Sequence, residues 1–167
     1  MIFAKTVSDK DINKHIDQVN EILKKVFVEE KKYKEEEVFN IRGPHIRGQE
    51  KHHVLLYEDF KEEELIGYGR LIINNDTANI MWVAVKQEFR GRKYGDLIIR
   101  MLIDKARTLF FKEIYVDLPH NLVNMFEKIG FYRTGNIKTS EDYQIRLKYK
   151  MNKPNSCRKN HNNVDQI

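Results

Sequence analysis

The sequence is poor in residues that mark several classes of protein. It has one cysteine, Cys157, which excludes an internal disulfide framework and a zinc site built from cysteines. Three prolines and eight glycines in 167 residues are too few for a collagen-like or linker-like chain. No apolar run approaches the ~20 residues that a membrane-spanning helix needs, and the N-terminus becomes charged too early for a secretory signal. We expect a soluble, cytoplasmic protein with no metal site and no membrane partner.

The charge of the chain does not by itself identify a partner. The formal net charge is +5 and the pI is about 9.1. However, lysine and glutamate are interspersed along the sequence, and a general bias towards Lys, Asn and Ile raises the pI without any function. The length fits one domain, which we place at residues 1–150. Residues 151–167 have no periodicity and are expected to form a disordered tail.

The first half of the chain is expected to form a helix and antiparallel strands. Residues 2–7 alternate as a strand, and Ser8 with Asp11 resembles a capping box that starts an amphipathic helix. The charged run from Glu29 to Glu37 is expected to be a solvated helix end or a loop. Three further strands with short connections follow, which favours antiparallel pairing: residues 53–57, 65–73 and 78–85.

The second half changes to a strand–helix–strand pattern. An amphipathic helix begins between Gly91 and Gly95, and a buried strand follows at residues 114–118, so a parallel crossover is predicted. A short helix ends at Gly130, and residues 143–149 alternate as a last strand. The predicted fold class is α/β with a mixed sheet, antiparallel in its first half and parallel in its second.

A turn that could bind phosphate lies between the strand ending at Val85 and the helix that follows. The first-turn amides of a helix have no intrahelical partner, and the helix dipole adds positive potential there. Gly91 and Gly95 allow the backbone to approach a ligand closely. Three cations lie in the same turn: Arg90, Arg92 and Lys93. The turn has neither the Gly-x-Gly-x-x-Gly pattern nor the P-loop pattern, so taken alone it is a weak signal.

Two motifs at matching spacing resemble the GNAT superfamily of N-acetyltransferases. VAVKQEFRGRKYGDLII (residues 83–99) is similar to the acyl-CoA-binding signature Arg/Gln-x-x-Gly-x-Gly/Ala of that family. Arg90 takes the first position and Gly95 the last, while Lys93 stands where a glycine usually does. MFEKIGF (residues 125–131) resembles the family motif F-Y-E-K-L-G-F, and LKKVFVEE (residues 23–30) resembles a group of small bacterial GNAT proteins of unassigned substrate.

The resemblance implies a GNAT-like fold over residues 1–150 and acetyl-CoA as the acyl donor. The parallel crossover would carry the acyl-CoA site. Main-chain groups of the strand at residues 78–85 would pair with the pantetheine arm, and the turn after that strand would bind the diphosphate. The residues that the resemblance assigns to CoA are Val83, Ala84, Val85, Arg90, Gly91, Arg92, Lys93, Tyr94, Gly95, Asn121, Asn124 and Phe126. The reaction would be direct attack of a primary amine of a small molecule, peptide or protein on the thioester. The sequence does not predict the acceptor, and the resemblance is compatible with a homodimer.

The acid and the base of such a reaction stay open. Phe126 replaces the tyrosine that often donates a proton in the family, so Tyr132, Tyr94 or water would have to do so. The strand at residues 78–85 contains no aspartate or glutamate, and the candidate bases elsewhere are His53, Glu58, Asp76 and His120. His53 and Tyr132 are the candidates we keep, although packing explains both. Trp82 could face the acceptor cleft, but we expect it to pack in the core.

Two other functions are compatible with the sequence. A GNAT-like domain could bind acyl-CoA without turnover, as a sensor or structural subunit. This function is compatible with Phe126, which cannot donate a proton, and with the strand at residues 78–85, which contains no acidic residue. A basic protein could also bind nucleic acid through Arg90, Arg92 and Lys93. The sequence has no helix-turn-helix, zinc finger or RNP-like aromatic motif, so nucleic-acid binding ranks last.

Overall fold

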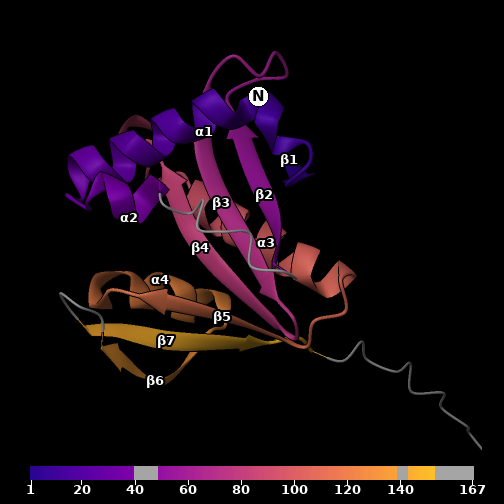
Figure 1. Cartoon of the computed structure of the whole chain (residues 1–167), viewed down its shortest axis with the longest axis vertical. Coiled ribbons are helices and arrows are strands. Elements are labelled where there is room, and N and C mark those ends of the chain that lie inside the picture. The colour runs from indigo at the N-terminus through magenta and orange to yellow at the C-terminus, as the bar shows by residue number, and fades with distance from the viewer. Residues whose placement is uncertain (40–48, 139–142, 153–167) are drawn as a thin grey trace, which may run out of the picture.

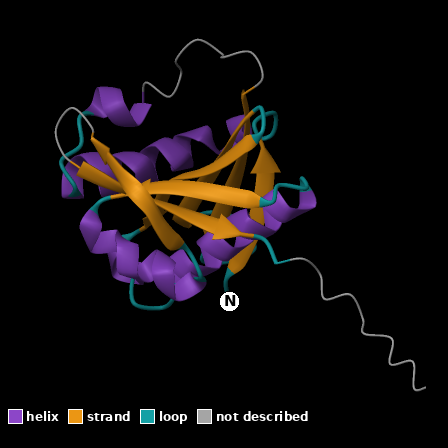
Figure 2. Cartoon of the chain, turned by 90° about the horizontal axis from the view of Figure 1, so that it is seen from below, coloured by secondary structure: helices purple, strands orange, loops and turns teal. Residues whose placement is uncertain are grey.

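A computed structural model describes residues 1–39, 49–138 and 143–152 and shows a seven-stranded sheet with helices on both sides (Figures 1 and 2). The strands are β1 (Phe3–Ser8), β2 (Gln49–Tyr57), β3 (Leu65–Asn74), β4 (Thr77–Val85), β5 (Glu113–Leu118), β6 (Tyr132–Lys138) and β7 (Tyr143–Lys150). The main helices are α1 (Ile16–Leu23), α2 (Glu35–Phe39), α3 (Tyr94–Thr108) and α4 (His120–Ile129). Short helical segments are η1 (Ile12–His15), the π-helix η2 (Lys24–Glu30) and η4 (Gln87–Phe89).

The sheet is mixed, as the sequence predicts, but only one pair of its strands is parallel. The order is β1-β2-β3-β4-β5-β7-β6, and β1 to β4 pair antiparallel. The predicted crossover through α3 is confirmed, because β4 and β5 are parallel neighbours. The expectation of a parallel second half is wrong beyond that pair, since β7 runs antiparallel to both β5 and β6. β6 was not predicted from the sequence, because its residues are nearly all exposed and show no apolar alternation.

The N-terminal helix begins later than the capping box predicts. Ser8 is the last residue of β1, and its hydroxyl donates to the side chain of Asp11 at 3.1 Å instead of capping a helix. The helical structure starts with η1 at Ile12 and continues through α1 and η2 to Glu30. The charged run from Glu29 to Glu37 is largely exposed, as expected, but it includes the end of η2 and the start of α2.

Each face of the sheet has its own hydrophobic core. The first core packs α3 and α4 against one face, and buries five apolar residues of α3: Ile98, Ile99, Leu102, Ile103 and Ala106. The second core lies under α1, η2 and α2 on the opposite face. Leu97, also on α3, is 38% exposed. The close approach of α3 favours a glycine at Gly69, because a Cβ there would overlap Cγ2 of Ile98 and lie 3.0 Å from Leu102 Cδ1.

The limits of the domain stay a prediction. β7 ends at Lys150, and the predicted tail lies outside the described residues beyond Asn152. Within the described ranges, no helix has both the length and the apolar character needed to cross a bilayer.

Candidate active site

The parallel pair β4–β5 is held together at only one end. Its register has three residue pairs, Ala78↔Ile114, Asn79↔Tyr115 and Ile80↔Val116. Beyond Ile80 the two strands diverge (Figure 1), and a cavity of about 1250 Å³ opens between them. Residues 81–85 of β4 all line this cavity. Their backbone groups on this side have no strand partner in β5, so they are available to a ligand.

A bulge in β4 accompanies the divergence. Arg70 pairs with Met81 and Tyr68 with Ala84, so β4 has one residue more than β3 between these pairs. Such an extra residue bends a strand and increases its twist. Trp82 lies in the bulge with a φ of 55°, a left-handed conformation that is costly for a bulky side chain. The bulge therefore turns β4 away from β5 at the point where their pairing stops.

The predicted phosphate-binding turn follows β4 and ends at the first residue of α3. Gly91 has a φ of 80°, and Lys93, the N-cap of α3, has a φ of 62°. Lys93 thus adopts the backbone conformation that the usual glycine would take with less strain. No side chain caps the helix, and Gly91, Lys93, Tyr94 and Gly95 line the cavity. The amides of the first turn of α3 are therefore free to bind an anion.

Arg90 stabilises the turn through contacts within the protein. Its Nε donates to the carbonyl oxygen of Val85 at 2.9 Å, and its Nη2 lies 2.6 Å from Glu30 Oε2. The second carboxylate oxygen of Glu30 is buried and has no hydrogen-bond partner among the described residues. Arg90 thus joins the turn to η2, the helix on the opposite side of β4, through an ion pair.

The structure brings most of the predicted cofactor residues to one cavity. Those that line it are Val83, Ala84, Val85, Arg90, Gly91, Lys93, Tyr94, Gly95, Asn121 and Phe126. Arg92 and Asn124 are exposed and do not line it. The Arg92 guanidinium instead lies 5.8 Å from the ring centre of Phe89.

His53 lies in a buried chain of hydrogen bonds away from the cavity. Arg70 Nε donates to the Tyr68 hydroxyl at 2.8 Å, and this hydroxyl lies 2.8 Å from His53 Nδ1. On the other side of the ring, Asp9 Oδ1 can only accept, so neutral His53 carries its proton on Nε2 and donates to Asp9 at 3.0 Å, while Nδ1 accepts from the Tyr68 hydroxyl. Burial lowers the pKa of His53 to about 4, although the hydrogen bond to Asp9 opposes the shift. His53 is a neutral, structural residue, and it does not line the cavity.

Tyr132 is also outside the cavity. It is the first residue of β6 and is 40% exposed, with Lys148 Nζ 5.9 Å from its ring centre. Among the described residues that line the cavity, the carboxylates are Asp96 and Asp117. Each has an arginine partner, at 2.7 Å for Asp96 with Arg100 and 2.8 Å for Asp117 with Arg146. Each of these two carboxylates therefore has an arginine as its counter-charge.

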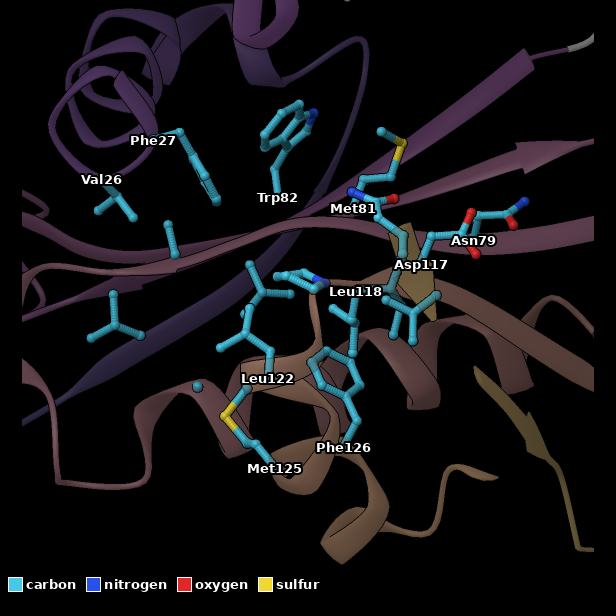
Figure 3. A pocket seen from close by; sticks show the side chains of 18 of the residues that line it. Val26, Phe27, Asn79, Met81, Trp82, Asp117, Leu118, Leu122, Met125 and Phe126 are labelled. Carbon is cyan, nitrogen blue, oxygen red and sulfur yellow. The ribbon is translucent and has the colours of Figure 1, made fainter. Parts of the chain in front are cut away.

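The cavity also has an aromatic side, which no sequence motif predicts. Phe27 and Tyr33 line it from η2 and the segment after it, and Trp82, which we expected in the core, joins them from β4. In Figure 3, Phe27 and Trp82 lie on one side of the cavity, and Leu122 and Met125 of α4 lie on the other. No motif marks the aromatic residues, and only the fold shows that they meet. The described residues contain no group of three or more His, Cys, Asp or Glu side chains placed to hold a metal.

Several solved structures have a fold similar to that of this chain. An acyl-CoA N-acyltransferase from Pseudomonas aeruginosa has a TM-score of 0.73 and 18% identity, covering 89% of this chain and 99% of that one. ElaA of Escherichia coli has a TM-score of 0.72 and 20% identity, with coverage of 89% and 99%. An aminoglycoside 6'-N-acetyltransferase complexed with coenzyme A has a TM-score of 0.69 and 15% identity, with coverage of 91% and 99%. These similarities concern the fold.

The sequence gives the stronger evidence for a family. The model of the acetyltransferase (GNAT) family matches residues 16–131, which include η2, the divergent strands, the turn before α3 and all of α4. This match covers more than half of the chain and includes both motifs that the sequence analysis identified. The chain belongs to the GNAT family of acetyltransferases.

Proposed function

We propose that the protein is an acetyl-CoA-dependent N-acetyltransferase that acts on a primary amine. One observation carries the proposal: the unpaired side of β4 and the uncapped N-terminus of α3 open into the same cavity. A strand without a partner can pair with an extended amide-containing arm, and a helix N-terminus binds phosphate. Coenzyme A contains both groups in one molecule, and a neighbour of the same fold is described as complexed with coenzyme A.

Different residues of the cavity would bind different parts of the donor. The amides from Gly91 to Gly95 would bind the diphosphate, with the Lys93 side chain adding positive charge. The backbone of residues 83–85 would pair with the pantetheine arm. The apolar side chains of Leu122, Met125 and Phe126, which line the cavity from α4, would contact the arm from the other side.

The chemistry is transfer of an acetyl group from sulfur to nitrogen. The neutral amine attacks the thioester carbonyl carbon, a C–N bond forms and the C–S bond breaks. The nitrogen loses a proton and the CoA thiolate gains one. Phe126 is 1% exposed and cannot donate a proton, and the described carboxylates of the cavity are ion-paired. We therefore expect water to carry both protons, with positioning supplying most of the rate.

Thiol release from acetyl-CoA in the presence of primary amines tests this function. The proposal expects release that depends on the amine and that saturates with acetyl-CoA. The missing proton donor at Phe126 keeps a second function open, acyl-CoA binding without turnover. A rise in melting temperature with CoA but no release over a broad amine panel would support that second function. No effect of millimolar CoA on the melting temperature would contradict both.

A further inference from the structure

An aromatic wall, formed by Phe27, Tyr33 and Trp82, lines the cavity on the side of η2. The Phe27 and Trp82 ring centres are 4.7 Å apart at an interplanar angle of 73°. Tyr33 lies 6.0 Å from Trp82 at 81° and 5.9 Å from Phe27 at 83°. All three pairs have edge-to-face geometry, which is favourable for aromatic rings. The wall is therefore a packed surface that can hold its shape without a ligand.

The aromatic wall lies on the opposite face of the sheet from the residues proposed to bind the donor. Phe27, Tyr33 and Trp82 pack with the core under α1 and η2. Val83, Tyr94, Leu122 and Met125 pack instead with the core under α3 and α4. A donor that enters along α3 and α4 thus leaves the aromatic wall to the second substrate. This assignment of the acceptor side depends on the proposed function.

Lys31 shows how an ammonium group can bind at the aromatic wall. Its Nζ lies 5.3 Å from the ring centre of Phe27, within cation–π range, and the side chain lines the cavity. Partial burial and the charge of Arg90 lower the pKa of Lys31, with Glu30 opposing the shift. A substrate amine that lies near Lys31 against the aromatic wall would experience the same two effects. Its neutral form, which is the nucleophile, would become more accessible without a dedicated base.

The charged side chains that line the cavity are largely paired with one another. The described carboxylates that line it are Asp96 and Asp117, and both are paired with arginine. Arg146 is the partner of Asp117, and Arg90 is paired with Glu30. Two lysines, Lys31 and Lys93, also line the cavity. Neutral polar groups line the part of the cavity near the start of β4, including Asn74, Thr77 and Asn79.

We infer that the acceptor is a primary amine carried on a single aromatic or aliphatic apolar group, which packs against Phe27, Tyr33 and Trp82. An aminoglycoside, the acceptor class named for one neighbour, is polar on all sides and has no apolar body to pack against the aromatic wall. The aromatic wall supplies apolar contact for the body of the substrate and a π face for its one ammonium.

Trp82 is the single tryptophan of the chain, so intrinsic fluorescence reports on the aromatic wall directly. We would titrate phenethylamine and kanamycin into the protein in the presence of CoA, and measure thiol release from acetyl-CoA with each amine. The expected result is a saturable change in Trp82 fluorescence with phenethylamine, and a kcat/KM at least tenfold higher than with kanamycin. A higher kcat/KM for kanamycin, or turnover of other amines without any fluorescence response to phenethylamine, would overturn the inference alone. Absence of thiol release with every amine would instead overturn the proposed function, and this inference with it.

Leucine variants separate the aromatic wall from the donor site. Phe27→Leu and Tyr33→Leu keep an apolar side chain and remove a π face, so we expect KM for phenethylamine to rise about tenfold. The shift in melting temperature with CoA should be unchanged, which also shows that each variant is folded. Phe110→Leu is the matched control, because Phe110 is 92% exposed and does not line the cavity. An unchanged KM in both wall variants would contradict the inference.

Discussion

Arg90 and Glu30 form a 2.6 Å ion pair that joins the turn before α3 to the π-helix η2. The pair is partly exposed, with 41% of the Arg90 side chain and 25% of the Glu30 side chain accessible. It connects the proposed donor site to the helix that carries Phe27 of the aromatic wall. The carboxylate of Glu30 also neutralises a cation next to the site proposed for a diphosphate.

Glu30→Gln should therefore strengthen CoA binding. Removal of one negative charge raises the positive potential at the turn, and we expect an affinity gain of about threefold at low salt that decreases as salt is added. Isothermal titration at two salt concentrations measures it. Glu127→Gln is the control, because Glu127 pairs with Arg133 at 2.9 Å on α4 and does not line the cavity. Weaker CoA binding in Glu30→Gln would show that the ion pair positions the turn instead.

Lys93→Gly should stabilise the fold. Lys93 has a φ of 62°, which costs a non-glycine residue roughly 1 kcal/mol. Glycine removes this cost but gives the unfolded chain more freedom, so we expect a net gain of about 0.5 kcal/mol in the free energy of unfolding, measured with urea. Lys93→Ala keeps the strained backbone and should show no gain. Both variants lose a cation, so both should bind CoA more weakly than the wild type.

Gly95 allows a test of the proposed place of the donor. It lines the cavity, and an added Cβ would lie 3.8 Å from Met125 Sδ, an ordinary contact distance. Gly95→Ala should fold normally and keep its melting-temperature shift with CoA. Gly95→Trp should place an indole in the cavity and abolish that shift. A Gly95→Trp variant that still responds to CoA would place the donor elsewhere.

His53 should make stability depend on pH without affecting turnover. Its pKa is lowered from 6.5 to about 4 in the folded protein, so the unfolded chain gains a proton first as the pH falls. Stability from this residue is complete above pH 6.5 and decreases between pH 6.5 and 4, by up to roughly 3 kcal/mol. Urea unfolding at pH 7 and pH 5 should show a smaller pH effect in His53→Gln than in the wild type.

Two measurements complete the test of His53. His120→Gln is the matched control, since His120 is exposed on α4, and it should keep the wild-type dependence of stability on pH. In thiol release, His53→Gln should keep the wild-type dependence of kcat on pH, because His53 does not line the cavity. A change in that profile would mean that His53 takes part in proton transfer after all.

The sequence predicted the donor side of the cavity better than the acceptor side, for a physical reason. A turn that binds phosphate needs particular residues at fixed spacing, and Arg90 to Gly95 are contiguous. The aromatic wall combines Phe27 and Tyr33 with Trp82, which is about 50 residues away in sequence. These residues meet only because a bulge in β4 turns Trp82 towards η2. The left-handed backbone conformation of Trp82 and Lys93 also could not be predicted from their residue types, since neither type favours it.

The divergence of β4 and β5 also bears on the solubility of the protein. An unpaired strand edge can pair with edges of other molecules and cause aggregation. Here that edge lines the cavity, whose other side is formed by residues of β5 and α4, so a second protein chain would have difficulty reaching it. β6, one of the two outer edges of the sheet, is protected differently, by a register irregularity between Arg133 and Gly135 and by exposed charges at Arg133 and Lys138. The molecule can thus keep part of β4 open for a small ligand, while neither that part nor β6 readily nucleates intermolecular sheet.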